Sequence, residues 1–199
     1  MALVVDNAAL NSFNSDPAAL DALRAAVEQG MQQLHAGTAQ QHTWGHGPAD
    51  GSPGTLGLQN AASPTLGGIV RMFPIAPSAR GVADARWVLL YDSTTAQLRG
   101  MVSDEALNAV RTATPAALVA AYCATGATEL AVLGSGKQAW AAVLTTLRAV
   151  PTLRTVRVFS PNAEHRAALA QRAAALGVAA TPVDSAEAAV RGAAVVAVC

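Results

Sequence analysis

The ten residues Leu130-Ala-Val-Leu-Gly-Ser-Gly-Lys-Gln-Ala139 decide the fold of this chain. An apolar, strand-like run is followed at once by the pattern Gly-x-Gly-x-x-Ala, within which a helical pattern begins. The first glycine permits a tight turn, the second lets a pyrophosphate approach the backbone, and the small third residue lets the helix pack on the strand. N–H groups at the helix start then hold the anion. The stretch predicts a dinucleotide-binding loop, and a glycine-rich turn without a ligand is the alternative.

After this loop the chain alternates strictly between short apolar runs and helical patterns. The succession predicts a parallel sheet with helices on its faces. Its last apolar run ends at Cys199 and is typical of a central strand, which later elements would normally cover, so we expect a C-terminally truncated chain. The expected strands are 130–133, 155–159, 178–183 and 193–199, and the expected helices are 138–149, 163–176 and 185–191.

The end of the second strand in this alternation bears on the choice between NAD and NADP. An NAD site usually places Asp or Glu there, to accept a hydrogen bond from the ribose 2′-hydroxyl. The sequence has Ser160-Pro-Asn162 instead, with His165 and Arg166 close behind. A small Ser beside a cation can accommodate a 2′-phosphate, which favours NADP. The alternative is that Arg166 is simply an exposed helix residue.

The first half of the chain predicts a mixed α+β domain. A helix is expected over 15–37, because Ser15 or Asp16 can cap it, Pro17 suits its first turn, and apolar residues recur at three- and four-residue spacing. Residues 37–68 are rich in Gly, Pro, Ser and Gln, so they are expected to form a loop.

Strands and two short helices are expected between this loop and the phosphate loop. The last two strands form an antiparallel pair joined by a turn. Thr114 is the expected N-cap of the second helix, because Pro115 follows it in the position that suits a first turn. The expected strands are 68–73, 86–91 and 98–102, and the expected helices are 103–111 and 114–126.

The composition excludes several classes of partner. The 199 residues carry a formal net charge of zero and only 13% are charged, so no strong field favours nucleic acid or an anionic membrane. No apolar run approaches the ~18 residues that cross a bilayer, and no targeting segment is evident, so we expect a cytoplasmic protein.

His42 and His46 lie in the expected loop without a third ligand, which argues against a metal site. Ser135 lacks the His and acid pattern of a catalytic nucleophile.

A second motif, Ala109-Val-Arg-Thr-Ala-Thr114, precedes the phosphate loop. Together the two motifs resemble the ornithine cyclodeaminase and mu-crystallin family, collinearly from about residue 68 to the end. The resemblance implies a usually dimeric protein with an α+β substrate-binding and dimerisation domain over 1–112. An incomplete, doubly wound Rossmann domain for NAD(P) would follow over 113–199.

The resemblance also assigns residues to the cofactor. Arg111 and Thr112 would meet its phosphates, and an Arg suits that place because its planar fork matches a phosphate group. A surface salt bridge at a helix end is the alternative for Arg111. The residues expected to bind NAD or NADP are Arg111, Thr112, Gly134, Ser135, Gly136, Lys137, Gln138, Ala139, Ser160 and Arg166.

One position departs from the family pattern. Members commonly carry a Lys a few residues before a Phe-Pro pair, where it contacts the substrate carboxylate or assists proton transfer. Here the segment is Gly67-Gly-Ile-Val-Arg-Met-Phe-Pro74, with no Lys, and Arg71 is the nearest cation. Arg71 could bind a carboxylate, but a guanidinium is a poor proton donor or base.

By resemblance, the function is that of an NAD(P)-dependent enzyme of amino-acid or imine metabolism, acting on a small amino acid or cyclic imine. Members deaminate and cyclise ornithine with recycled NAD, reduce cyclic ketimines, or oxidise amino acids. The protein would hold cofactor and substrate in register, since the cofactor supplies the chemistry. Two alternatives remain: a cofactor-dependent binding protein without turnover, of the mu-crystallin type, and an inactive fragment.

Overall fold

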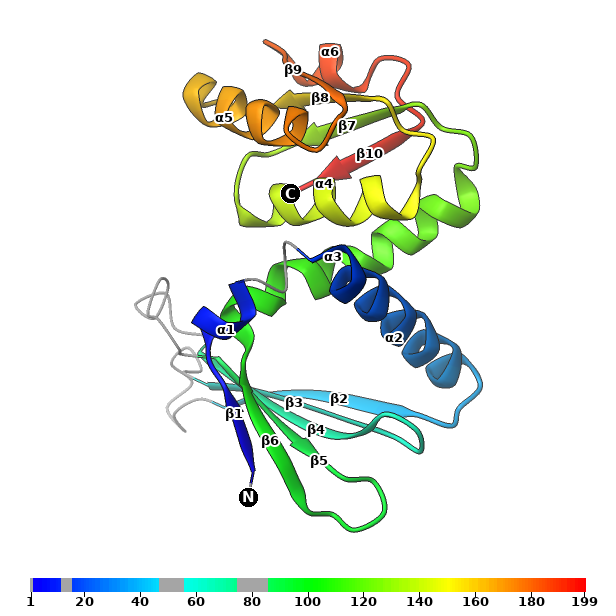
Figure 1. Cartoon of the computed structure of the whole chain (residues 1–199), viewed down its shortest axis with the longest axis vertical. Helices are drawn as coiled ribbons and strands as arrows, with labels where there is room; N and C mark the ends of the chain where they lie inside the picture. Colours follow the sequence, from blue (N-terminus) through cyan, green and yellow to red (C-terminus); the bar gives the residue numbers. More distant parts are fainter. Residues whose placement is uncertain (1, 12–15, 47–55, 75–85) are drawn as a thin grey trace. The chain divides into compact units, whose positions relative to one another are not determined.

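The chain divides into two compact units, Met1–Asn108 (unit 1) and Ala109–Cys199 (unit 2), in a computed structural model. The structure describes residues 2–11, 16–46, 56–74 and 86–199. The boundary expected between 112 and 113 falls inside helix α3 (Asp104–Cys123), slightly after this division. Each unit is built around its own sheet (Figure 1).

Unit 1 contains a six-stranded sheet in the order β1-β6-β5-β4-β3-β2. All neighbours are antiparallel except β1 and β6, which run parallel. The expected strands and the antiparallel β5–β6 pair are confirmed. The strands are β1 (Leu3–Val5), β2 (Gln40–His46), β3 (Leu56–Ser63), β4 (Gly67–Pro74), β5 (Trp87–Tyr91) and β6 (Leu98–Ser103).

The loop expected over 37–68 is wrong where the structure describes it, because β2 and β3 lie inside that range. These segments contain few β-branched residues, so their intrinsic strand propensity is weak. β3 is nevertheless paired on both sides, from Leu56↔Pro74 to Ser63↔Gly67 on β4 and along the whole of β2. Backbone pairing with neighbouring strands overrides the weak local preference.

Helix α2 (Pro17–His35) confirms the helix expected over 15–37. Asp16 caps it by accepting a hydrogen bond from the Ala18 N–H at 2.9 Å, while Ser15 lies outside the described residues. The polar side chain of Gln33 donates to Thr65 Oγ1 at 2.6 Å and so joins the helix to the turn between β3 and β4. A further short helix, α1 (Asn7–Asn11), follows β1.

Helix α3 is continuous, so the two helices expected over 103–111 and 114–126 are wrong. Thr114 does not cap a new helix; its hydroxyl donates to the Val110 carbonyl at 2.7 Å, one turn back in the same helix. Pro115 lies inside the helix, where it lacks the N–H for the bond to the preceding turn and its ring crowds the carbonyl there. The cap-and-proline pattern is therefore ambiguous between a helix start and a helix interior.

Unit 2 confirms the predicted alternation of strands and helices. Its four strands are all parallel, in the order β10-β7-β8-β9, so the chain proceeds outward from β7 and returns to β10 on its other side. Such a reversal is where open α/β sheets bind ligands, beyond the carboxyl ends of the strands. The elements are β7 (Glu129–Leu133), α4 (Lys137–Ala149), β8 (Thr155–Phe159), α5 (Ala163–Ala174), β9 (Ala179–Pro182), α6 (Ala186–Val190) and β10 (Val195–Val198).

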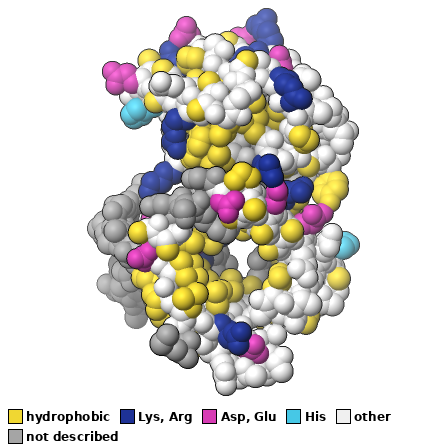
Figure 2. Space-filling model, viewed as in Figure 1, with side chains coloured by type: hydrophobic (Ala, Val, Ile, Leu, Met, Phe, Trp, Pro, Cys, Tyr) yellow, Lys and Arg dark blue, Asp and Glu magenta, His cyan; other side chains and the backbone are white. Residues whose placement is uncertain are grey.

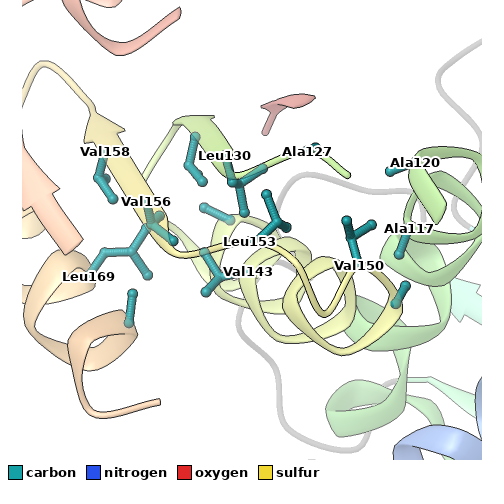
Figure 3. Close-up of a cluster of buried hydrophobic side chains, with 14 of the residues drawn as sticks. Ala117, Ala120, Ala127, Leu130, Val143, Val150, Leu153, Val156, Val158 and Leu169 are labelled. Carbon is teal, nitrogen blue, oxygen red and sulfur yellow. The ribbon is translucent and has the colours of Figure 1, made fainter. Parts of the chain in front are cut away.

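The core of unit 2 fixes the positions of β7 and α4 (Figure 3). Leu130, Val132, Val156 and Val158 are fully buried in the two central strands, and Val143 of α4 packs with them. Each such side chain contributes roughly 1.5–3 kcal/mol by leaving water. The loop between β7 and α4 is thus held by rigid elements on both sides.

Candidate nucleotide-binding site

Gly134 makes the turn out of β7. Its φ is 129°, a conformation that side-chain-bearing residues rarely adopt. Its N–H donates to the Phe159 carbonyl at 2.8 Å, and a Cβ added to it would lie 2.6 Å from the Cys199 carbonyl oxygen. The positive φ agrees with the tight turn predicted from the sequence, and the close approach of Cys199, the residue after Val198, leaves no room for a side chain.

Gly136 has a different reason for being glycine. Its φ of −85° is ordinary, and a Cβ added to it would meet no protein atom within 4 Å. It is the N-cap of α4 and supplies no side-chain hydrogen bond. Helices α2, α5 and α6, in contrast, are capped by Asp16, Asn162 and Ser185.

The start of α4 thus offers backbone N–H groups to an outside anion, because no N-cap side chain occupies them. Ala139 is fully buried, which confirms that a small residue packs this helix on the sheet. Lys137 is exposed and Gln138 half-buried on the first turn. The open space at Gly136 is where a side chain would block a pyrophosphate, so these residues fit the phosphate group of a dinucleotide.

A chain of hydrogen bonds connects this loop to the end of β8. Ser135 Oγ donates to Ser160 Oγ at 2.9 Å, and Ser160 Oγ donates to the Asn162 carbonyl at 3.1 Å. Ser160 is buried. The structure therefore brings together the phosphate loop and the position expected to face the ribose, although the two lie on different strands.

Arg166 lies at the same edge and is well anchored. Its Nη1 donates to the Ser160 carbonyl at 3.2 Å, and its Nη2 lies 2.5 Å from Oδ1 of Asp184. The Arg166 side chain is only 16% exposed, so it is more enclosed than a simple surface residue. Sequence reasoning missed Asp184, although its place just beyond a parallel strand, two residues after Pro182, was a usable signal.

Arg111 and Thr112 lie within α3, in the same unit as the loop. The side chain of Arg111 is half-buried and that of Thr112 is exposed. Their contact with cofactor phosphates stays a prediction.

Arg71 belongs to a separate polar cluster in unit 1. Its Nε lies 2.5 Å from Oδ2 of Asp104, Nη1 donates to Gln59 at 2.7 Å, and Nη2 donates to Asn108 at 3.1 Å. Its guanidinium also lies 4.4 Å from the ring centre of Phe73. Asp104 is fully buried, so this carboxylate already neutralises the cation to which a substrate carboxylate was expected to bind.

The two histidines considered for a metal site both lie on β2. His42 stacks on Trp44, with ring centres 5.5 Å apart. The backbone of His46 lies four residues further on, roughly 13 Å along the strand, and its side chain lies outside the part of the chain that the structure describes. Within the described part of the chain, no three His, Cys, Asp or Glu side chains are grouped to hold a metal. No helix in that part is both long and apolar enough to span a bilayer.

The fold and the loop together define the class of protein. Unit 2 is a Rossmann-type unit with its Gly-x-Gly-x-x-Ala loop at the reversal of strand order, and an α+β unit precedes it. The sequence model of the ornithine cyclodeaminase/mu-crystallin family matches residues 15–199, and this chain belongs to that family.

Several solved structures with the same fold are named as enzymes. An archaeal alanine dehydrogenase dimer with bound NAD is 15% identical, with a TM-score of 0.76 over 92% of this chain and 56% of that one. Thermococcus litoralis Δ1-pyrroline-2-carboxylate reductase, in complex with NADH and L-proline, is 15% identical, with a TM-score of 0.79 and coverages of 98% and 61%. The iminosuccinate reductase of Paracoccus denitrificans, in complex with NAD+, is 22% identical, with a TM-score of 0.78 and coverages of 92% and 57%. This chain thus spans less than two thirds of their length, and no curated protein sequence matches it.

Proposed function

We propose that this chain binds NAD or NADP on the loop Gly134–Ala139 and belongs to an oxidoreductase of amino acids or cyclic imines. The observation that carries the proposal is the start of α4: an uncapped helix with open space at Gly136, at the reversal point of a parallel sheet. When bound, the nicotinamide supplies hydride transfer at a carbon that bears nitrogen. The chain's own task is to seat and orient the dinucleotide.

The remaining site residues have proposed roles around this seat. Gly134, Ser135 and Lys137 shape and flank the loop, and Arg111 and Thr112 supply further phosphate contacts. Ser160 and Arg166 face the adenine ribose, which favours NADP because the described end of β8 carries no carboxylate to accept from a 2′-hydroxyl.

The proposed substrate is a small amino acid or a cyclic imine. Family membership supports this class, as do the imine and amino-acid reactions named for structures of the same fold. Arg71 is the proposed contact for the substrate carboxylate, and it would have to share its guanidinium with Asp104. Replacing Arg71 with Lys should then raise KM for the amino acid while kcat changes less.

A binding protein without turnover is the second candidate, favoured by one observation. The segment before Phe73-Pro74 has no Lys, and its nearest cation is an Arg whose guanidinium is bonded to a buried Asp. A guanidinium stays protonated near neutral pH and cannot relay protons. Following NADH and NADPH absorbance with pyrroline-2-carboxylate and piperideine-2-carboxylate separates the two: turnover supports the enzyme, and nucleotide binding without turnover supports the binding protein or an inactive fragment.

The cofactor proposal has a sharper test in Gly136→Ser. The backbone at this position is extended, so Ser fits and its hydroxyl can cap α4, which should maintain stability or raise it by about a few tenths of a kcal/mol. The same side chain fills the space proposed for pyrophosphate, so nucleotide affinity should fall about tenfold or more, a loss of at least ~1.4 kcal/mol. Isothermal titration measures the affinity and urea unfolding the stability. Unchanged affinity in a folded variant would rule out this seat.

We also propose that the protein is a cytoplasmic homodimer that pairs through unit 1. Figure 2 shows hydrophobic side chains gathered over the part of unit 1 where β1 lies. Leu3 and Val4 belong to this edge strand, and both are more than 60% exposed. Val4→Glu should shift the sedimenting species towards monomer, and Val119→Glu on α3 is a control of similar exposure. An unchanged dimer would contradict pairing through β1.

Other strands of the unit 1 sheet also expose large apolar side chains. These are Trp44, Leu56, Leu90 and Leu98, on β2, β3, β5 and β6.

A further inference from the structure

The carboxyl ends of β8 and β9 meet at one edge of the unit 2 sheet (Figure 1). The strands are parallel neighbours, with Val158 opposite Pro182, and the Val183 N–H donates to the Val158 carbonyl at 2.9 Å. The residues that follow them, Ser160 and Asp184, are therefore brought to the same place. Arg166 of α5 bonds to both of these residues.

The two partners of Arg166 differ in how easily they can be displaced from the guanidinium. The Ser160 carbonyl belongs to buried backbone at the end of a central strand, so it fixes the guanidinium in place. Asp184 is 96% exposed, and an exposed carboxylate gains little from such a pair because water solvates it almost as well. The arginine is therefore the fixed partner, and the aspartate is the one that can be displaced.

We propose that Asp184 is a specificity-determining residue that limits how well this site accepts a 2′-phosphate, an inference that rests on the proposed nucleotide site. The 2′-phosphate of NADP carries a charge of about −1.5 to −2 and would need the guanidinium that Asp184 occupies. It must displace the carboxylate and then remain beside its negative charge. The 2′-hydroxyl of NAD is neutral and meets no such repulsion. Asp184 thus offsets part of the preference for NADP that Ser160 and Arg166 create.

Two simple nucleotides isolate this effect without any catalysis. Adenosine 2′,5′-bisphosphate and adenosine 5′-monophosphate differ only in the 2′-phosphate, so the ratio of their affinities reports that group alone. Isothermal titration into the full chain should show that Asp184→Asn tightens the bisphosphate about five- to tenfold, from Coulomb repulsion across a few ångströms of screened solvent. Affinity for the monophosphate should not change.

Two further variants test whether Asp184 acts through Arg166. Arg166→Gln should weaken the bisphosphate about tenfold or more, because a charged hydrogen bond to phosphate is lost. In the Arg166→Gln background, adding Asp184→Asn should raise the affinity for the bisphosphate much less than Asp184→Asn does in the wild-type chain. Glu129→Gln is the charge-matched control, because it removes a carboxylate paired with Arg157 at the opposite, amino end of the strands.

The outcomes separate this inference from the proposed function. If the monophosphate and the bisphosphate both bind but Asp184→Asn leaves their affinity ratio unchanged, Asp184 has no part in specificity and the nucleotide site stands. If Glu129→Gln raises the ratio equally, the effect is one of net charge and the inference is overturned. If neither nucleotide binds the wild-type chain, the proposed nucleotide site itself fails.

Discussion

Two arginine–aspartate pairs in this molecule have the same closest N–O distance, but one carboxylate is buried and the other is exposed to solvent. In unit 1, Arg71 lies 2.5 Å from Asp104, whose side chain is 0% exposed. In unit 2, Arg166 lies 2.5 Å from Asp184, whose side chain is 96% exposed. A buried carboxylate cannot exchange its partner for water at low cost, whereas an exposed one can. Burial therefore decides that the first pair maintains the fold and that the second can yield to a ligand.

The largest expected effect is on the buried pair. Asp104→Ala leaves the Arg71 guanidinium buried without its carboxylate, which should lower the free energy of unfolding by about 3–5 kcal/mol. Urea unfolding of the full chain measures this loss. Asp184→Ala is the matched control and should leave the unfolding midpoint unchanged. Equal losses from both variants would contradict the distinction between the two pairs.

A smaller net effect is expected when both members of the buried pair are replaced. Arg71→Met combined with Asp104→Leu removes both charges and fills similar volume, so stability should recover to within about 1–2 kcal/mol of the wild type. Gln59 and Asn108 then lose a partner, which accounts for the remaining deficit. If the double variant is as unstable as Asp104→Ala, the pair stabilises the fold by more than the neutralisation of one buried charge by the other.

A third prediction asks what fixes Arg166. Asn162 caps α5 by accepting a hydrogen bond from the His165 N–H at 2.9 Å. Asn162→Ala should therefore cost about 1 kcal/mol of stability. The ratio of bisphosphate to monophosphate affinity should persist, because the Ser160 carbonyl still holds the guanidinium. If titration of the Asn162→Ala variant shows equal affinities for the bisphosphate and the monophosphate, the start of α5, and not the end of β8, positions this arginine.

The smallest expected effect concerns a carboxylate held by backbone groups instead of by a cation. The Thr95 and Thr94 N–H groups donate to Asp92 and lower its pKa below the ordinary value of 3.8, while Arg99 contributes least. Because the folded pKa is the lower one, this stabilisation is present above pH 3.8 and is lost as the pH falls through the folded pKa. Melting temperatures recorded from neutral pH to about pH 2 should fall slightly more for the wild type than for Asp92→Asn. Identical profiles would contradict this account.

Unit 2 was predictable because local pattern and tertiary structure agree there. Its two central strands, β7 and β8, are short and buried, and the loop pattern stands directly between a strand and a helix. In unit 1, β2 and β3 depend on pairing with neighbours, and their composition resembles a loop. Pro115 suggested a helix boundary although it lies inside α3.

The candidate site shows the same division. The residues of the loop Gly134–Ala139 could be named from their spacing, because all of their chemistry lies within one turn. The partner of Arg71 is 33 residues away and that of Arg166 is 18 residues away, so neither pair follows from spacing. Only the sheet topology brings such residues together.

The contact between Ser135 and Ser160 also bears on how this site could evolve. Ser135 already donates its hydroxyl to the side chain of Ser160, the residue that follows β8. An acidic residue at position 160 would find that donor in place, and its second carboxylate oxygen would be available for a ribose hydroxyl. If the proposed nucleotide site is correct, a single exchange at this position would shift its preference between the two nicotinamide cofactors without any change in the phosphate loop.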